Sequence, residues 1–292
     1  MNWFLLAFTS AVFSAAASIS EKKALFNVGV LEFSFFMSLF GVLFSIPFFF
    51  AIDYTTLTVV SLGILFVKSV MGALAFFCVM YALKNLEISR ALPLLVLTPG
   101  FVAFFAFIFL GESLSHFEII GMVLLLTGTY ILEVKSKEEL IEPFKVFFKS
   151  TAHHYIVFAL LLFTATSIMD KLLVGNYKMH PYTYMGFQQL FYAFIFLLLM
   201  IFAGKSFRVS TGLIEKSDWV LIIVVALLTV GYRYTQIEAV KIAPVALVLS
   251  VKRISVFIAA IGGGQIFKEK NLLKKAVATA IMIAGALLIL DE

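Results

Sequence analysis

The sequence has little charge and almost no cysteine. Asp, Glu, Lys and Arg make up only 13% of its 292 residues, whereas soluble domains carry about 25%. So few charged side chains cannot cover the water-facing surface of a soluble protein of this length. The single cysteine, Cys78, lies within an apolar stretch, which excludes a disulfide framework and a thiolate metal site. We therefore expect neither a metal ion nor another cofactor.

Hydrophobic residues are abundant and make up 62% of the chain, against about 45–50% in soluble domains. Crossing the hydrocarbon core as a helix takes about 20 residues, whereas membrane β-strands are about 10 residues long and alternate in polarity. The apolar stretches of this chain are too long and too uniform for such strands. The sequence therefore predicts an all-α membrane protein with ten transmembrane helices, at about 3–20, 30–52, 57–83, 88–110, 117–134, 155–174, 182–203, 219–240, 243–267 and 272–290.

A polar stretch at 135–154 divides the chain into two halves of five helices, at 1–134 and 155–292. An offset of 157 residues pairs Lys84 with Lys241 and Glu112 with Glu269, and an offset of 149 pairs Glu21-Lys22 with Asp170-Lys171. Polar pairs at equivalent helix ends indicate an internal repeat. Because five is odd, the second half must enter the membrane from the opposite side. The sequence thus predicts a five-plus-five inverted repeat around a linker, an arrangement that suits alternating access.

The charges outside the helices predict an orientation. Fifteen Lys and Arg residues lie in loops on one side of the membrane, and only Lys171, Lys178 and Lys241 lie on the other. The positive-inside rule places the fifteen in the cytosol and both termini outside it. The first stretch has no basic residues before it, so we expect a retained helix rather than a signal peptide. The short loops suit the cytoplasmic membrane of a prokaryote.

Four cations lie inside the predicted helices, where the sequence places no carboxylate at comparable depth. A mid-membrane Lys or Arg costs roughly 2.5–3.5 kcal/mol, so these cations must face the interior or water. Counted at about 1.5 Å per residue, several of them reach one level near the midplane together with two glutamines and flanking tyrosines. Transporters keep substrate sites at this level. The predicted substrate-binding residues are Lys252, Arg253, Arg233, Lys68, Gln188, Gln189, Tyr232 and Tyr234.

Structural roles are open alternatives for some of these residues. Lys68 could extend along the helix toward the interface or bond backbone carbonyls. Gln188 and Gln189 could join neighbouring helices by hydrogen bonds. Lys252 and Arg253 are adjacent and point about 100° apart on a helix, so one of them could serve packing or gating.

Sequence motifs at the ends of two predicted helices resemble those of a known transporter family. Ten short-looped helices in two halves, with Leu110-Gly111-Glu112-Ser113-Leu114 closing the fourth and Phe267-Lys268-Glu269-Lys270 closing the ninth, resemble the EamA-type drug/metabolite transporter superfamily. The resemblance covers the whole chain. Val251-Lys252-Arg253 is similar to the Lys-Arg pair that holds phosphate in the plastid sugar-phosphate/phosphate translocators of that superfamily. It implies that Lys252 and Arg253 bind an anionic group, and it implies cytosolic termini, opposite to the loop charges.

These observations predict a secondary-active transporter that moves a small anionic metabolite, an organic phosphate or a carboxylate, by alternating access and by exchange. The alternative is an exporter of amino acids or neutral metabolites of the same superfamily. We do not expect an enzyme, because all four histidines lie near helix ends or in loops without a catalytic partner. The expected partners are a small-molecule substrate and the lipid bilayer, not nucleic acid, for a monomer or homodimer.

Overall fold

The computed structural model describes residues 2–85, 97–133, 151–205, 214–255, 258 and 272–290. These residues form ten α-helices, one short 3-10 helix, η1, and one π-helical turn, η4, and no strand occurs among them. The elements are α1 (Trp3–Leu25), α2 (Val30–Phe49), η1 (Tyr54–Thr56), α3 (Val59–Asn85), α5 (Thr98–Leu110), α6 (His116–Glu133), α8 (Thr151–Lys171), η4 (Leu172–Asn176), α9 (Pro181–Phe202), α11 (Lys216–Ile242), α12 (Val245–Lys252) and α14 (Leu272–Leu290).

The all-α membrane fold predicted from the sequence is confirmed. Six segments are long and apolar enough to cross a membrane, namely α1, α2, most of α3, α8 with η4, α9 and α11, and three shorter apolar helices lie in α5, α6 and α14. Large apolar side chains cover the outside, and Phe104, Phe107 and Phe109 on α5 are each more than half exposed. Lipid tails are the solvent that such a surface fits.

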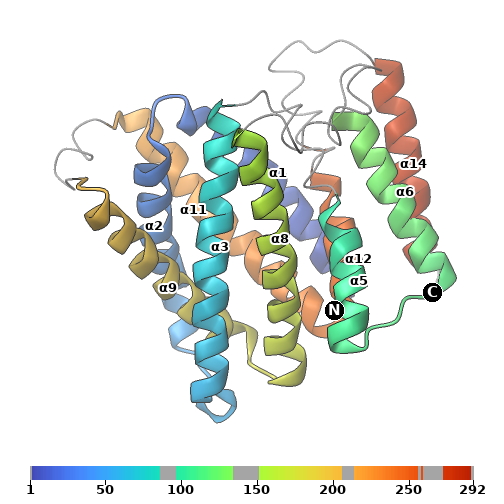
Figure 1. The fold of residues 1–292 in the computed structure, drawn as a ribbon, viewed down its shortest axis with the longest axis horizontal. Helices are drawn as coiled ribbons and strands as arrows, with labels where there is room; N and C mark the ends of the chain where they lie inside the picture. The colour runs from blue at the N-terminus through green and yellow to red at the C-terminus, as the bar shows by residue number, and fades with distance from the viewer. Residues whose placement is uncertain are drawn as a thin grey trace.

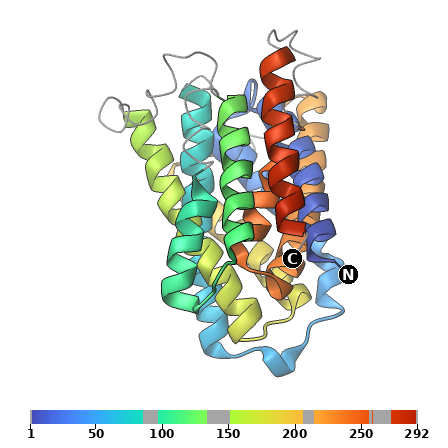
Figure 2. The ribbon, with the colours of Figure 1, turned by 90° about the vertical axis from the view of Figure 1, so that its right-hand side faces the viewer.

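The helices alternate up and down, and α9 and α11 run obliquely to α3 and α8 (Figure 1), while Figure 2 shows the bundle from the side. α1 begins and α14 ends at the same end of the bundle, which we call the terminal face. The connections at 50–58, 111–115, 172–180 and 243–244 lie at this face. The connection at 26–29, the end of α9 and the start of α11 lie at the opposite one, the loop face. The positions of both termini agree with ten crossings.

The contacts between helices of the two halves show the symmetry of the predicted repeat. If α1, α2, α3, α5 and α6 correspond to α8, α9, α11, α12 and α14, then the packing of α1 on α11 is mirrored by that of α3 on α8. Likewise, α2 on α11 is mirrored by α3 on α9, and α5 on α8 by α1 on α12. The remaining major contacts, α2 with α9, α5 with α12 and α6 with α14, join equivalent helices. The inverted repeat is therefore confirmed.

Some predicted boundaries lie outside the described residues. Most of the linker predicted at 135–154 is outside them, and residues 151–154 already belong to α8. The ninth stretch was predicted to run to residue 267. α12 ends at Lys252 with Arg253 as its C-terminal cap, residues 254–255 and 258 are again helical, and residues 256–257 and 259–271 lie outside the described part of the chain.

The connection between α2 and α3 is tied to α9 at the terminal face. The Asp53 carboxylate accepts hydrogen bonds from the backbone N and the Oγ1 of Thr55, at 2.9 and 2.5 Å. These bonds stabilise the ionised form and lower the pKa of Asp53. The backbone N of Asp53 donates to Thr183 Oγ1 at 3.1 Å, near the start of α9. The polar connection thus holds the two helix ends together.

Candidate functional site

A buried carboxylate joins cations from both halves of the protein. Asp170, near the end of α8, lies with Oδ1 3.0 Å from Lys68 Nζ of α3 and Oδ2 3.1 Å from Arg233 Nη2 of α11. Lys68 and Asp170 are each only 2% exposed. Tyr184 of α9 donates its hydroxyl hydrogen to Asp170 Oδ1 and accepts hydrogen bonds from Lys68 Nζ and Arg233 Nη2. Four helices therefore converge on one network, which we call the Asp170 cluster (Lys68, Asp170, Tyr184 and Arg233).

The expectation that no carboxylate lies as deep as the cations is wrong, because Asp170 is buried among them. The apolar stretch continues for several residues after Asp170, and η4 extends the helical path to Asn176. Asp170 therefore lies inside the membrane segment although it comes one residue before the end of α8. A buried charge needs a partner of opposite sign, and this continuation of apolar sequence was the signal that could have identified Asp170.

Lys252, the last residue of α12, has a different environment. Its Nζ donates to Gln236 Oε1 of α11 at 2.6 Å and lies 4.3 Å from the centre of the Tyr232 ring. In the described part of the chain, no carboxylate lies within ion-pair distance of Lys252. The charges of Arg233, Arg253, Asp170 and Glu21 act on it at longer range. Lys252 is therefore a cation that neutral groups hold in place.

Polar side chains also follow one face of α9 away from the Asp170 cluster. Tyr184, Gln188 and Tyr192 are spaced by four residues, which places them one above the other on a helix. Gln188 Nε2 donates to the Tyr192 hydroxyl at 3.1 Å. The tyrosine hydroxyl lies against Gly72 of α3, where an added Cβ would come within 2.5 Å of it. This polar ladder leads from the cluster toward the loop face.

Two polar atoms beside the cluster lack hydrogen-bond partners. Gln188 Oε1 and Arg233 Nε are buried, and neither has a partner among the described residues. A buried polar group without a partner loses its hydration without compensation, at roughly 1–3 kcal/mol. One is an acceptor and the other a donor, so a ligand with both kinds of group would satisfy them.

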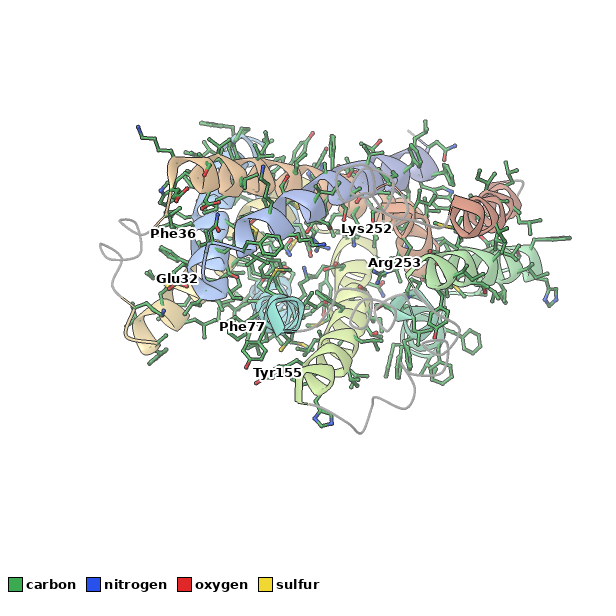
Figure 3. The ribbon with its side chains drawn as sticks, turned by 90° about the horizontal axis from the view of Figure 1, so that it is seen from above. Glu32, Phe36, Phe77, Tyr155, Lys252 and Arg253 are labelled. Carbon is green, nitrogen blue, oxygen red and sulfur yellow. The ribbon has the colours of Figure 1, made fainter. Side chains whose placement is uncertain are left out.

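The predicted site residues occupy several environments. Lys68 and Arg233 meet at Asp170, Tyr232 lies beneath Lys252, and Gln188 belongs to the ladder on α9. Gln189 instead lies against Gly41 of α2, where its Oε1 would come within 2.7 Å of an added Cβ. Tyr234 stacks with Tyr182 and Phe48, at ring-centre distances of 5.6 and 5.4 Å. In Figure 3, Lys252 and Arg253 lie next to each other toward the middle of the molecule.

Comparison with known proteins agrees with this architecture. The model of the EamA-like transporter family matches residues 1–134 and 150–291, nearly the whole chain in two repeats. The chain belongs to this family. It is therefore a multi-pass membrane protein and a transporter of the drug/metabolite superfamily, in contact with lipid and with a small-molecule substrate.

The fold of this EamA-like transporter is also found among solved structures. One crystal structure of a protein superposes with a TM-score of 0.73 at 15% sequence identity, covering 98% of this chain and 96% of the other. At that identity the likeness concerns the fold alone. No curated protein matches the chain. The comparisons do not address the Lys252-Arg253 pair, whose role in anion binding stays a prediction.

The described part of this EamA-like transporter contains no set of side chains that could bind a metal ion. No group of three or more His, Cys, Asp or Glu side chains is placed there to hold an ion. The polar centre instead offers ammonium, guanidinium, amide and phenol groups. These groups bind anions and hydroxyl-bearing molecules by hydrogen bonds and charge.

Proposed function

We propose that the protein carries a small anionic metabolite, an organic phosphate ahead of a carboxylate, by alternating access. The observation that carries the proposal is the half-buried ammonium of Lys252, which contacts Gln236 and Tyr232 and has no acid at ion-pair distance among the described residues. Nearby, Arg233 has a buried Nε without an acceptor. An anion between Lys252 and Arg233 would neutralise the first and accept a hydrogen bond from the second.

The chemistry of the two cations suits this guest. Arg presents a planar fork that matches phosphate or carboxylate oxygens, and Lys acts as a mobile point charge. Arg233 uses Nη2 for Asp170 and Tyr184, which leaves Nε for a ligand. Asp170 holds the guanidinium in place, so the ligand does not have to order it. Binding then costs less conformational entropy.

Gln188 indicates that the substrate also carries a hydrogen-bond donor. Its Oε1 is a buried acceptor without a donor among the described residues, and a ligand hydroxyl would supply that donor. A sugar phosphate or a hydroxycarboxylate has both an anionic group and such a hydroxyl. An amino acid would offer an ammonium group to the same atom, and this is the observation that favours the alternative, an exporter of amino acids.

We also propose exchange. The sequence suggested it for all the cations inside the helices, whereas the structure suggests it for Lys252. Asp170 neutralises part of the charge of Lys68 and Arg233, so those two cations do not require a substrate anion to cross the membrane. In the described part of the chain, Lys252 has no such acid within ion-pair distance. An unneutralised cation moving through low dielectric is costly, so we propose that return of the carrier is fastest with an anion bound at Lys252.

Reconstituted vesicles test the substrate class. Purified protein is placed in liposomes loaded with a hexose phosphate, and uptake of the same labelled compound is measured against excess phosphate esters, carboxylates or amino acids. We expect phosphate esters to compete most strongly, and uptake into empty vesicles to be slower than into loaded ones. Lys252→Gln should reduce uptake about tenfold or more, the order of one charge-assisted hydrogen bond.

The matched control is Lys241→Gln, because Lys241 is an exposed lysine at the end of α11. This variant should transport like the unmodified protein. Competition by amino acids alone would favour the alternative substrate, and equal uptake into empty and loaded vesicles would contradict exchange.

A further inference from the structure

An ion pair at the terminal face joins four elements of the protein. Lys171, the last residue of α8, lies with Nζ 3.2 Å from Glu112 Oε1. The same ammonium donates to the backbone oxygens of Val240 and Ala243, at 2.9 and 2.8 Å, where α11 ends. The other carboxylate oxygen of Glu112 accepts a hydrogen bond from the backbone N of Val245, at 3.1 Å, where α12 begins. Each charged group therefore also satisfies a helix end.

The chain around Glu112 is shaped for this contact. Gly111 caps α5 in the left-handed conformation, with φ +66°, which is accessible at low cost to glycine. The chain turns there, and Glu112 leaves the end of α5 in the direction of α8 and α12. Glu112 also belongs to the motif that closes the fourth predicted helix, and the proposed substrate site leaves it without a role.

The Glu112–Lys171 pair is more buried than ordinary surface ion pairs. The side chains of Lys171 and Glu112 are 17% and 13% exposed, so water screens their attraction little. At the loop face, Lys205 pairs with Glu32, but the lysine side chain is 51% exposed. Lys205 follows the end of α9 and Glu32 belongs to α2, and these two helices already pack against each other. Exposed pairs contribute about 0–1 kcal/mol, so we expect the Glu112–Lys171 pair to contribute more than the Glu32–Lys205 pair.

Aromatic stacking strengthens the closure of the terminal face. Phe48 of α2 stacks on Tyr182 of α9 and on Tyr234 of α11, at ring-centre distances of 5.7 and 5.4 Å. Together with the Glu112–Lys171 pair, these rings link helices of both halves at one end of the bundle. A carrier that works by alternating access must separate such contacts each time this face opens.

We infer that Glu112 and Lys171 form a latch that keeps the terminal face closed, and that the latch is coupled to the substrate site. Lys171 follows Asp170 directly, so one turn of α8 carries both the latch and the carboxylate that holds Lys68 and Arg233. Glu112 acts as a positioning residue, because it fixes the start of α12, the helix that ends at Lys252. A change in how Asp170 is paired therefore moves the residue that closes this face. The inference rests on the transporter assignment and not on the chemical class of the substrate.

Cysteine labelling tests the latch without any ligand. In a Cys78→Ala background, which removes the single native thiol, Ala246→Cys reports on the buried first turn of α12 and Ala159→Cys on a buried position of α8 nearer the loop face. The probe is a bulky water-soluble maleimide. Glu112→Gln retains an oxygen for Val245 but loses the charge, so labelling at position 246 should become roughly tenfold faster. Labelling at position 159 should not.

Variants of Lys171 complete the design. Lys171→Met should increase the rate of labelling at position 246 at least as much as Glu112→Gln does. Lys171→Arg should be labelled as slowly as the parent protein, because it keeps the charge. If labelling at both reporters rises together, the pair only stabilises the fold and the latch is refuted. Unchanged labelling at position 246 in Glu112→Gln protein with the melting temperature of its parent would refute it equally. Either result leaves the proposed substrate class untouched.

Discussion

Asp170 is the acidic partner of two of the cations inside the membrane segments. It contacts Lys68 and Arg233 through different oxygens, and Tyr184 bridges all three. Removing one partner of a buried ion pair leaves the other charge uncompensated. The cluster therefore has a structural function even without substrate. Lys252 is held by an amide and a ring, and the acids that act on it among the described residues, Asp170 and Glu21, lie at longer range.

Sequence reasoning found the cations but not their arrangement. Lys68, Arg233 and Lys252 are conspicuous because a charge in an apolar stretch is rare, and that signal does not depend on tertiary structure. Tyr184 and Gln236 gave no comparable signal, because polar and aromatic residues are common near helix ends. Their roles depend on which helix faces which, and this is decided by packing. Tyr234 follows Arg233 in sequence but stacks with Tyr182, so its role in substrate binding stays a prediction.

A glycine tests the close approach of α3 and α9 beside the polar ladder. In Gly72→Ala, the new Cβ would lie 2.5 Å from the Tyr192 hydroxyl. Such overpacking costs typically 1–3 kcal/mol, so we expect the melting temperature in detergent to fall. Tyr192→Phe removes the obstructing oxygen, and the double variant should be more stable than the sum of the two single effects predicts.

Gly63 provides the control on the same helix. An added Cβ there meets nothing within 4 Å, and alanine favours helix over glycine by roughly 0.8–1 kcal/mol. Gly63→Ala should therefore leave the melting temperature unchanged or raise it. Equal losses at Gly63 and Gly72 would show that the contact with Tyr192 is not the cause.

Among the elements, α6 and α14 lie side by side at one edge of the molecule (Figures 1 and 2). A Cβ on Gly121 would lie 2.7 Å from the backbone oxygen of Gly285, and one on Gly285 would lie 2.6 Å from that of Gly121. Small residues let membrane helices approach through their backbones. The two helices can therefore accept no side chain at this crossing without moving apart.

Substitution at this crossing should separate the pair. We expect Gly121→Ala and Gly285→Ala each to lower thermal stability in detergent by about 1–3 kcal/mol. The double variant should lose less than the sum, because the helices have already moved apart. Gly100→Ala in α5 is the control, since its Cβ would meet only Leu126 Cδ1 at an ordinary 3.9 Å. Full additivity would argue against a shared backbone contact.

At the scale of the whole molecule, the scaffold is symmetric and the polar centre is not. The offset of 157 residues that pairs Glu112 with Glu269 would pair Lys68 with Val225 and Arg233 with Phe76. The order and directions of the helices were predictable, because the repeat is visible in the lengths of the apolar stretches and in the polar pairs at equivalent helix ends. The mirrored contacts follow from that repeat. The polar centre was not, because it is built from differences between the halves.

The proposed function requires an anion that binds at Lys252, and ligand-dependent thermal unfolding in detergent measures this binding directly. The protein, Lys252→Gln and Lys241→Gln are heated with inorganic phosphate, a hexose phosphate, a small carboxylate or an amino acid. A ligand at 100 times its Kd stabilises the folded state by about 2.7 kcal/mol. We predict that an anion stabilises the unmodified protein and Lys241→Gln but not Lys252→Gln. Stabilisation of Lys252→Gln by the same anion to the same extent, or of none of the three by any anion, would contradict the account.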